Sequence, residues 1–495
     1  MHFINGEWIE GTGPALQSHE PVSGGIVWSG RAAKNDEVNR AILAARAASK
    51  DWANLPLLKR ADYLNAFAQQ LRDHKAELVE MICRETGKPR WESSTEVDAM
   101  INKIALSIEA QAKRRAQSQT ESAGVIMATR YKPHGVVAVL GPFNFPGHLP
   151  NGHIVPALLS GNTIVFKPSE LTPGVAQKTT ELCVAAGLPA GVLNLVQGAK
   201  ETGTHLVSHP GIDGVFFTGS FTVGRAINRA LADHPGKIAA LEMGGNNPLI
   251  VHNVSDLTAA AYWTIQSAFV TAGQRCSCAR RLIVPEDASG NKFIDRLVEM
   301  TRRVIVGPYT QSPEPFMGPV ITEAAAQKLL QAQTDLQSRA AGSLIEMEAR
   351  SANGRHTLLS PGIIDVSGDK DREDVEFFGP LLQLIRVKNF DQAIAEANNT
   401  RFGLAAGLFS DDHALFNRFY REARAGVINF NRPLTGASSA LPFGGVGDSG
   451  NHRPSAYFAS DYCSYPVAMM ETEKLAMPKT LSPGIQNDGT ADERR

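Results

Sequence analysis

The sequence is poor in cysteine and has no excess of charge of either sign. Its 495 residues include only five cysteines, an odd and scattered set that argues against a disulfide framework and favours a reducing compartment. Basic residues number 49 and acidic residues 50, for a formal net charge of -1. This balance excludes a general electrostatic attraction to nucleic acid or to an anionic membrane, so any charged partner must be bound by local groups.

Long apolar runs are missing as well. No stretch reaches the roughly 18 apolar residues of a membrane span, and the N-terminal "MHFINGEWIEG" lacks the basic and apolar regions of a signal peptide. We therefore expect a cytoplasmic protein without membrane or nucleic-acid partners. The length exceeds what a single core usually supports and predicts two or three domains.

What the chain does contain is a change of pattern near residue 136. Before it, apolar residues at three- and four-residue spacing predict helical segments within 36–55, 59–88 and 96–117. After it, short apolar, β-branched runs ending in Gly, Pro or Ser alternate with helical stretches, which indicates βαβ units and a parallel sheet over about 136–242. Such sheets bind ligands beyond the carboxyl ends of their strands.

A second α/β pattern follows, with strands expected at 280–286 and 380–387, and the polar segment 481–495 is expected to be a flexible tail. Two further strand candidates, 124–133 and 461–470, stand apart from both blocks. Pro466 places the second at a sheet edge. Because an unpaired edge invites pairing with another chain, we expect these two strands to contribute to a homo-oligomer.

The stretch "TAGQRCSCARR" places Cys276 and Cys278 one residue apart, after a helix expected to end at Gly273. This spacing is poor for zinc, no Cys/His cluster accompanies it, and a disulfide across it would be strained, so we expect no metal. A single reactive thiol, its pKa lowered by a cation such as Arg275, is the chemical interpretation. Two small buried side chains are the alternative.

Three other motifs permit both a functional and a structural interpretation. Glu242 follows an apolar run and precedes two glycines, so it is either a partly buried general base with a raised pKa or an exposed loop acid. Gly219, Ser220 and Gly224 lie at a strand-to-helix junction that suits a phosphate or is a plain tight turn. Glu170, after Lys167, either binds a cofactor ribose or begins a helix.

Taken in order, seven motifs resemble the NAD(P)-dependent aldehyde dehydrogenase family over nearly the whole chain: "PFNFP", "KPSE", "FTGS", "LEMGGNNP", "GQRCSCA", "EFFGP" and "PFGGVGDSG". The resemblance implies that Cys276 is the nucleophile and that Glu242 activates the water that hydrolyses the thioester. It implies that the Asn144 side chain and the Cys276 backbone N–H form the oxyanion hole. Cys278 would be a bystander.

The resemblance also implies NAD as cofactor and an α/β fold in three parts. A Rossmann-like cofactor domain would comprise 1–118 and 136–242, the catalytic domain 243–453, and a small β oligomerisation flap 119–135 and 454–480, in a homodimer or homotetramer. The cofactor positions that it implies are Lys167, Ser169, Glu170, Gly219, Ser220, Phe221, Thr222, Val223, Gly224, Glu376 and Phe378.

Longer segments such as "NFNRPLTGASSALPFGGVGDSG" resemble the subfamily that oxidises N-succinylglutamate 5-semialdehyde in arginine catabolism. Its substrate carries two carboxylates, for which Arg275 and Arg432, with Ser438 and Ser439, are candidates; the arginines could equally form structural ion pairs. Succinate semialdehyde is an alternative substrate. Transfer to coenzyme A is disfavoured by the presence of Glu242, and a non-catalytic role by the presence of thiol, base and amide together.

Overall fold

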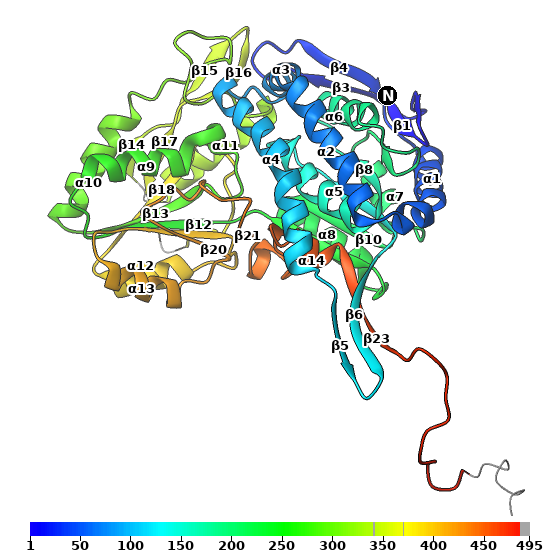
Figure 1. Cartoon of the computed structure of the whole chain (residues 1–495). Coiled ribbons are helices and arrows are strands. Elements are labelled where there is room, and N and C mark those ends of the chain that lie inside the picture. Colours follow the sequence, from blue (N-terminus) through cyan, green and yellow to red (C-terminus); the bar gives the residue numbers. More distant parts are fainter. Residues whose placement is uncertain (340–341, 370, 486–495) are drawn as a thin grey trace, which may run out of the picture.

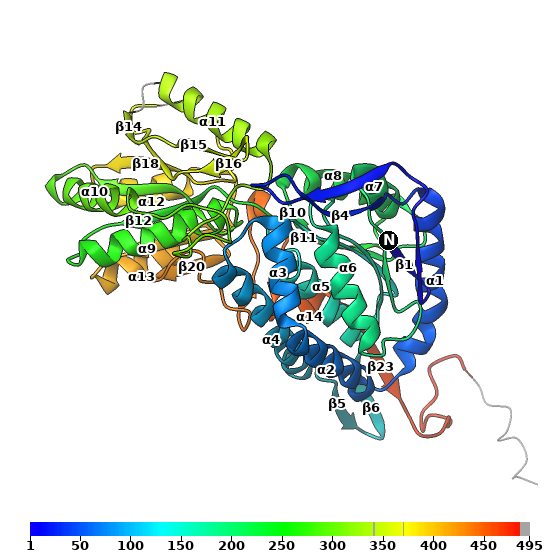
Figure 2. The ribbon, with the colours of Figure 1, turned by 90° about the horizontal axis from the view of Figure 1, so that it is seen from above.

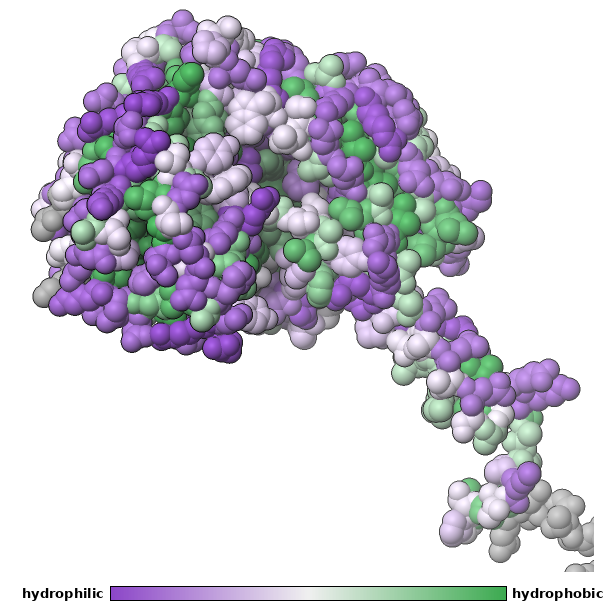
Figure 3. Space-filling model, turned by 60° about the vertical axis from the view of Figure 1, so that its left-hand side comes forward, coloured by the Kyte–Doolittle hydropathy of each residue, from purple (hydrophilic) through white to green (hydrophobic). Residues whose placement is uncertain are grey.

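Two α/β lobes lie side by side, and a narrow arm projects from the lobe that holds the N-terminus (Figure 1). The computed structural model describes residues 1–339, 342–369 and 371–485. Most of the side chains on the face shown in Figure 3 are hydrophilic, and the arm stands clear of the body there. No helix in the described ranges is long and apolar enough to cross a membrane.

The first lobe contains a seven-stranded sheet built from the short apolar runs expected after residue 136. In spatial order its strands are β11 (Ile238–Met243), β10 (Gly214–Gly219), β7 (Val136–Leu140), β8 (Thr163–Lys167), β9 (Leu193–Leu195), β1 (His2–Ile4) and β2 (Glu7–Ile9). The five strands from β11 to β9 run parallel, and β1 and β2 extend the edge antiparallel. The sequence pattern did not predict β1 and β2, which are only three residues long.

Helices cover both faces of this sheet, as Figure 2 shows from above. They are α1 (Asn35–Asn54), α2 (Leu57–Asp73), α3 (Lys75–Thr86), α4 (Arg90–Arg114), α5 (His148–Ser160), α6 (Pro173–Ala185), α7 (Lys200–Ser208) and α8 (Phe221–Leu231). Alternate residues of β7 enter different cores: Val137 and Val139 pack with α2–α6, whereas Val136 and Ala138 pack with α1, α7 and α8. The helical pattern of 59–88 forms two helices, which meet at His74.

The second lobe repeats this layered design. Its sheet has the order β14 (Gly342–Ile345), β17 (Gly362–Asp365), β18 (Leu381–Val387), β13 (Ala279–Pro285), β12 (Asn247–Val251), β19 (Ala405–Phe409) and β20 (Val427–Phe430), all parallel except β14. Helices α9 (Leu257–Phe269) and α10 (Ala288–Thr301) cover one face, and α11 (Glu323–Ser338), α12 (Phe390–Asn398) and α13 (His413–Glu422) the other.

The arm is a three-stranded antiparallel sheet in the order β23 (Ser464–Glu471), β6 (Val125–Pro133) and β5 (Ser118–Ser122). The two isolated strands expected from the sequence therefore pair with each other, and β23 lies at an edge as Pro466 indicated. The polar β5, "SQTES", carries no apolar signal and was missed. Of the expected tail, 481–485 has no helix or strand and 486–495 lies outside the described residues.

Short elements complete the fold. They are the strand pairs β3 (Ala15–His19) with β4 (Ile26–Arg31), β15 (Ala349–Ala352) with β16 (Arg355–Leu359), and β21 (Pro442–Phe443) with β22 (Ser455–Ala456), the 3-10 turns η1 (Val270–Gly273) and η2 (Gly447–Ser449), and α14 (Ala459–Tyr462). The link that matters most for the site is 244–246, because these three residues alone join β11 of the first sheet to β12 of the second.

Candidate active site

A pocket of about 280 Å³ brings together the three residues expected to be catalytic, Cys276, Glu242 and Asn144. The walls are formed by helices α4 and α5, by the loop 274–278 that carries Cys276, and by the segment 435–456. The lining residues are Thr95, Glu96, Ala99, Lys103, Asn144, Phe145, His148, Leu149, Gly152, His153, Glu242, Arg275, Cys276, Ser277, Thr435, Ala437, Ser438, Ser439, Phe443, Ser455 and Ala456. Most of these side chains are far apart in sequence, so only the fold assembles them.

The loop that carries Cys276 is held by a left-handed turn. The preceding helix ends at Phe269 rather than at Gly273, and a 3-10 turn follows in which Thr271, Ala272 and Gly273 all have positive φ. A Cβ atom at Gly273 would lie 2.1 Å from the carbonyl oxygen of Gly379, so this position requires glycine for space as well as for conformation. Strain at the two non-glycine residues is typical of functional segments.

The Cys276 thiol is half-buried and donates to Glu242 Oε1 at 3.7 Å. Burial, followed by the nearby carboxylates of Glu242 and Glu376, raises its pKa well above the ordinary value. The expectation that Arg275 lowers this pKa was therefore wrong, because two carboxylates and a dry environment oppose the thiolate. Cys276 is a thiol at neutral pH and needs a base to become a nucleophile.

Arg275 is occupied by a buried ion pair. Its Nη2 donates to Glu92 Oε1 at 2.8 Å and its Nε to Thr271 Oγ1 at 2.7 Å, and its guanidinium lies over the Phe145 ring. These contacts hold the strained turn against α4 and the loop that precedes α5. Arg275 nevertheless lines the pocket.

Glu242 lies at the end of β11 and faces the pocket, as expected from its position before two glycines. Burial raises its pKa to about 7, close to the pH at which a general base is most useful. Its two oxygens have different partners: Oε1 faces Cys276, whereas Oε2 accepts from Ser455 Oγ at 3.3 Å and Thr218 Oγ1 at 3.4 Å. One oxygen is thus held while the other faces the thiol.

A buried chain of hydrogen bonds continues behind Oε2. Thr218 Oγ1 is 3.0 Å from His153 Nε2, and His153 Nδ1 is 2.7 Å from the Tyr462 hydroxyl. Tyr462 has no other hydroxyl partner in the described part of the chain, so its proton points to Nδ1, which places the imidazole proton on Nε2 and turns the Thr218 proton toward Glu242. Burial lowers the pKa of His153 to about 3, which keeps the imidazole neutral.

The sequence analysis did not predict this series of buried hydrogen bonds. The available signal was the polar His153 at the start of the otherwise apolar segment "HIVPALL" of α5. Asn144 is buried beside the loop that carries Cys276, where its Nδ2 donates to the carbonyl of Gln274 at 2.9 Å. Its second Nδ2 hydrogen remains for a ligand. Cys278, the expected bystander, is fully buried.

The cofactor candidates of the "KPSE" segment follow β8. Lys167 Nζ donates to the carbonyls of Pro168 at 2.7 Å and Gly198 at 2.6 Å, and burial lowers its pKa to about 8. Glu170 lies 3.9 Å from that ammonium with 46% of its side chain exposed. The Ser169 hydroxyl accepts from the Leu171 N–H. Glu170 is therefore available to a ligand.

The candidates of "FTGSFTVG" lie at the junction of β10 and α8, where the sequence placed them. Ser220 caps α8 by accepting from the Val223 N–H at 3.4 Å, which leaves the N–H groups of Phe221 and Thr222 without intrahelical partners. Gly224 is required by packing, because a Cβ atom there would lie 2.3 Å from Met243 Sδ. Packing also favours glycine at position 219, since a Cβ atom there would lie 2.5 Å from the Phe217 ring.

Glu376 and Phe378 reach the same region from the second lobe. Glu376 accepts from the Gly245 N–H at 3.3 Å, and burial raises its pKa to about 7. Phe378 packs edge-on against Phe143, beside Asn144, with Arg280 over its ring. Among these candidates, Glu376 is close enough to Cys276 for its charge to raise the pKa of that thiol.

The substrate candidates of the 432–439 loop differ in position. Ser438 and Ser439 line the pocket, but Arg432 does not; it is exposed and its guanidinium lies over the Trp263 ring. Arg432 is therefore not one of the pocket cations in this conformation.

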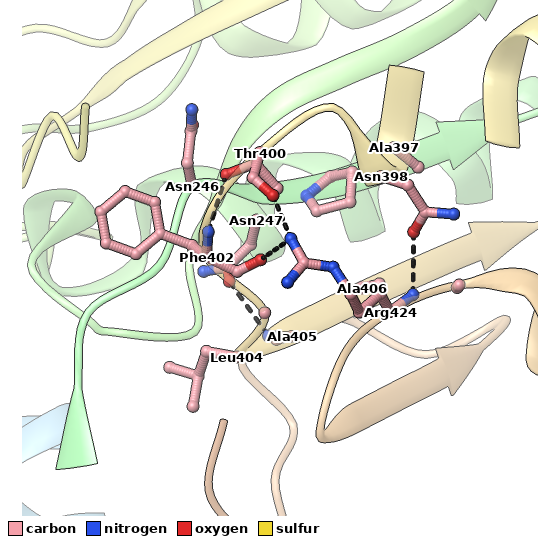
Figure 4. Close-up of a pocket in the computed structure, with 13 residues that line it drawn as sticks. Asn246, Asn247, Ala397, Asn398, Thr400, Phe402, Leu404, Ala405, Ala406 and Arg424 are labelled. Carbon is pink, nitrogen blue, oxygen red and sulfur yellow. Dashed lines mark hydrogen bonds between the residues drawn. The ribbon is translucent and has the colours of Figure 1, made fainter. Parts of the chain in front are cut away.

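A smaller hollow lies near Phe402 and Arg424 (Figure 4). Its volume is about 10 Å³, space for no more than one water molecule. Arg424 Nη2 donates to the carbonyls of Thr400 and Phe402, and its backbone N–H to Asn398 Oδ1. The Asn246 side-chain oxygen at its wall is buried without a partner in the described residues, but the space is too small for a substrate or cofactor, so we assign this hollow a structural role. No His/Cys/Asp/Glu group suited to a metal occurs within the described ranges.

Comparison with known proteins agrees with this geometry. A model of the "Aldehyde dehydrogenase family" matches residues 8–466. The N-succinylglutamate 5-semialdehyde dehydrogenases of Ectopseudomonas mendocina (strain ymp) and Chromobacterium violaceum are each 54% identical, over 98% of this chain and 99% of theirs.

Solved structures are similar over the same extent. A putative methylmalonate-semialdehyde dehydrogenase from Sinorhizobium meliloti 1021, complexed with NAD, has a TM-score of 0.90 at 28% identity, covering 96% of this chain and 98% of its own. The NADP-dependent glyceraldehyde-3-phosphate dehydrogenase from Bacillus halodurans C-125, complexed with NADP, has a TM-score of 0.88 at 30% identity, covering 95% and 98%. With the ordered motifs and the thiol–carboxylate pair in one pocket, these matches show that the chain belongs to the aldehyde dehydrogenase family.

Proposed function

We propose that the protein oxidises N-succinylglutamate 5-semialdehyde to N-succinylglutamate in arginine catabolism, with NAD as hydride acceptor. The observation that carries the chemistry is the Cys276 thiol 3.7 Å from Glu242 Oε1, with the Asn144 amide in the same pocket. The relatives with 54% identity support this choice of aldehyde.

The first step makes a covalent adduct. Glu242 takes the thiol proton, and Cys276 Sγ bonds to the aldehyde carbon. The carbonyl oxygen becomes an oxyanion, which the Asn144 Nδ2–H and the Cys276 backbone N–H stabilise; such donors contribute about 3–4 kcal/mol each to a transition state. The tetrahedral carbon then loses hydride, for which NAD would supply the acceptor when bound, and the adduct on Cys276 Sγ becomes a thioester.

The second step is hydrolysis. After Glu242 has released the thiol proton to solvent, its carboxylate removes a proton from water, and the hydroxide attacks the thioester carbonyl. The C–S bond breaks, the acid leaves, and Cys276 sulfur recovers a proton. A pKa of about 7 suits Glu242 to both proton transfers.

The residues present fit NAD. The free N–H groups in the first turn of α8 suit the pyrophosphate. Glu170, exposed beside Lys167, would accept from the adenosine-ribose hydroxyls and repel a 2′-phosphate, which favours NAD over NADP. Glu376, partly buried and held by the Gly245 N–H, would bind the nicotinamide ribose, and Phe378 would border the ring.

The positions of the side chains around the pocket indicate which of them would bind the substrate. Arg275, Ser438 and Ser439 line the pocket and would bind substrate, with Arg432 reaching it only by a change of rotamer.

We assign 1–118 and 136–242 to cofactor binding, 243–453 to catalysis, and 119–135 with 454–480 to subunit contacts. The unpaired edges of β23 and β5 support a homodimer or homotetramer.

The test is NADH formation at 340 nm with N-succinylglutamate semialdehyde and succinate semialdehyde, each with NAD and NADP. A kcat/KM at least about a hundredfold higher for the succinylated substrate with NAD is the expected result, equivalent to about 2.7 kcal/mol. Equal or reversed preference would contradict the substrate assignment and leave the dehydrogenase chemistry intact.

A further inference from the structure

Three cationic side chains lie around the pocket, and one of them has no carboxylate partner among the described residues. Lys88 pairs with Glu96, and Arg275 pairs with Glu92. Lys103 is 1% exposed, and its single hydrogen bond goes to the carbonyl of Ala456 at 2.6 Å. No carboxylate of the described residues lies within ion-pair distance of it. A buried ammonium without a counter-ion is costly, which suggests that a ligand supplies the missing charge.

The wall of the pocket that Lys103 lines has an opening without a packing reason. Gly152 is in the interior of α5, which packs alongside α4 (Figure 1), and both Gly152 and Lys103 line the pocket. A Cβ atom at Gly152 would have no neighbour within 4 Å. Glycine destabilises a helix interior relative to alanine, and here no neighbour requires it. The missing side chain leaves open space in the pocket wall.

His148, one turn earlier on α5, borders the same space. Its Nδ1 is buried without a hydrogen-bond partner. Burial, followed by the charges of Lys103, Lys88 and Arg275, lowers its pKa to about 4, so the imidazole is neutral. A neutral imidazole can donate one hydrogen bond to an anion without adding a further buried charge.

We propose that Lys103, His148 and the space at Gly152 form a subsite for a carboxylate of the substrate. The subsite rests on the proposed oxidation of a dicarboxylated semialdehyde and identifies where one carboxylate is bound. Lys103 forms the ion pair, His148 donates the second hydrogen bond, and Gly152 leaves room for the chain. The sequence alone did not indicate Lys103, which is one of two lysines in the amphipathic pattern of α4.

The charge of Lys103 is tested by Lys103→Met, with Lys113→Met on the exposed part of the same helix as control. Substrates are N-succinylglutamate semialdehyde and butanal, which has no carboxylate. We expect kcat/KM for the succinylated substrate to fall about 10- to 100-fold in Lys103→Met, the usual effect of losing a charged hydrogen bond, and butanal oxidation to change less than about twofold. An equal fall for both substrates, or no fall, would overturn the subsite.

An assay with N-acetylglutamate semialdehyde shows which carboxylate Lys103 binds, because this compound keeps the α-carboxylate and lacks the distal one. A Lys103→Met loss on both amino-acylated substrates assigns Lys103 to the α-carboxylate. A loss on the succinylated substrate alone assigns it to the distal carboxylate. Either result supports the subsite.

The space is tested separately at Gly152. Gly152→Ala should raise Tm, because alanine favours the helix and its Cβ atom meets no neighbour. Gly152→Leu should fill the opening and lower kcat/KM for the succinylated substrate about tenfold or more, with butanal little affected. Unchanged turnover of the succinylated substrate by Gly152→Leu would show that this space is not used.

Failure of the subsite and failure of the proposed function are distinguishable in the same assay. A wild-type enzyme with no preference for carboxylated aldehydes over butanal would contradict the proposed function. A wild-type preference that survives in Lys103→Met would contradict the subsite alone.

Discussion

The two sheets contribute opposite ends of their strands to the active site. In the first lobe, Asn144, Lys167 and Glu242 come after or at the carboxyl ends of β7, β8 and β11. In the second lobe, Cys276 and Phe378 precede β13 and β18, so they lie at amino ends. The reason is the three-residue link after β11, because it carries the chain into β12 before its direction can reverse.

This difference shows the range of a general rule. Open α/β sheets bind ligands beyond the carboxyl ends of their strands, and the first sheet follows that rule. The second sheet contributes Cys276, the proposed nucleophile, from the other end, because its amino end abuts the first sheet's carboxyl end. Strand direction therefore predicts the positions of the proposed base and cofactor residues of the first lobe, whereas the position of Cys276 depends on how the lobes meet.

The largest expected effect is at the amino end of the second sheet. Cys276→Ala removes the attacking sulfur and should lower kcat by about 10⁴-fold or more, as nucleophile removal does in covalent enzymes. Cys278→Ala, measured in the same NADH assay, should retain kcat within a few-fold. Comparable losses in both variants would show that the loop, rather than one thiol, limits turnover.

The matching change in the first sheet is Glu242→Gln, which should lower steady-state kcat about 10²- to 10⁴-fold. Wild-type kcat should rise with pH through about 7 and level off above, since the base must be deprotonated; the variant should lose this inflection. Stopped-flow detection of an NADH burst separates the steps. A burst without fast steady-state turnover assigns Glu242 to hydrolysis, and absence of the burst with a slow first turnover assigns it to thiol deprotonation.

The hydrogen-bond chain behind Glu242 predicts a smaller effect. His153→Leu removes the donor that turns the Thr218 hydroxyl proton toward Glu242. The carboxylate is then stabilised less, its pKa rises, and kcat at pH 7 should fall about tenfold. The pH inflection should move upward, so the deficit should shrink at pH 9. His153→Gln, which keeps an acceptor and a donor, should restore most activity. A deficit independent of pH would indicate a packing defect instead.

The smallest effect concerns the cofactor. Glu170→Gln removes the exposed carboxylate that we expect beside the adenosine ribose, and should reduce the NAD-over-NADP ratio of kcat/KM by about three- to tenfold. Glu201→Gln, at an exposed position in the first turn of α7, is the control. An unchanged ratio would show that Glu170 does not contribute to cofactor choice.

Several parts of the site could be predicted from local sequence because local chemistry determines them. The apolar runs that form β7, β8, β10 and β11, the strand-end position of Glu242 and its raised pKa all follow from burial and strand patterning. The environment of Cys276 could not be predicted in this way. Arg275 adjoins it in sequence, but Glu92 binds that arginine, and the thiol faces Glu242 instead.

By itself, the sequence determined the two α/β blocks and the two arm strands that pair with each other, since each depends on a periodic burial pattern, and its ordered motifs indicated Cys276, Glu242 and Asn144 as candidates through a family resemblance. Only the tertiary structure decided that Arg275 is neutralised, that Arg432 lies outside the pocket, and that Lys103 and the His153 chain border it. The physical reason is that charge compensation and solvent exclusion depend on groups distant in sequence, and no local pattern records which of them meet.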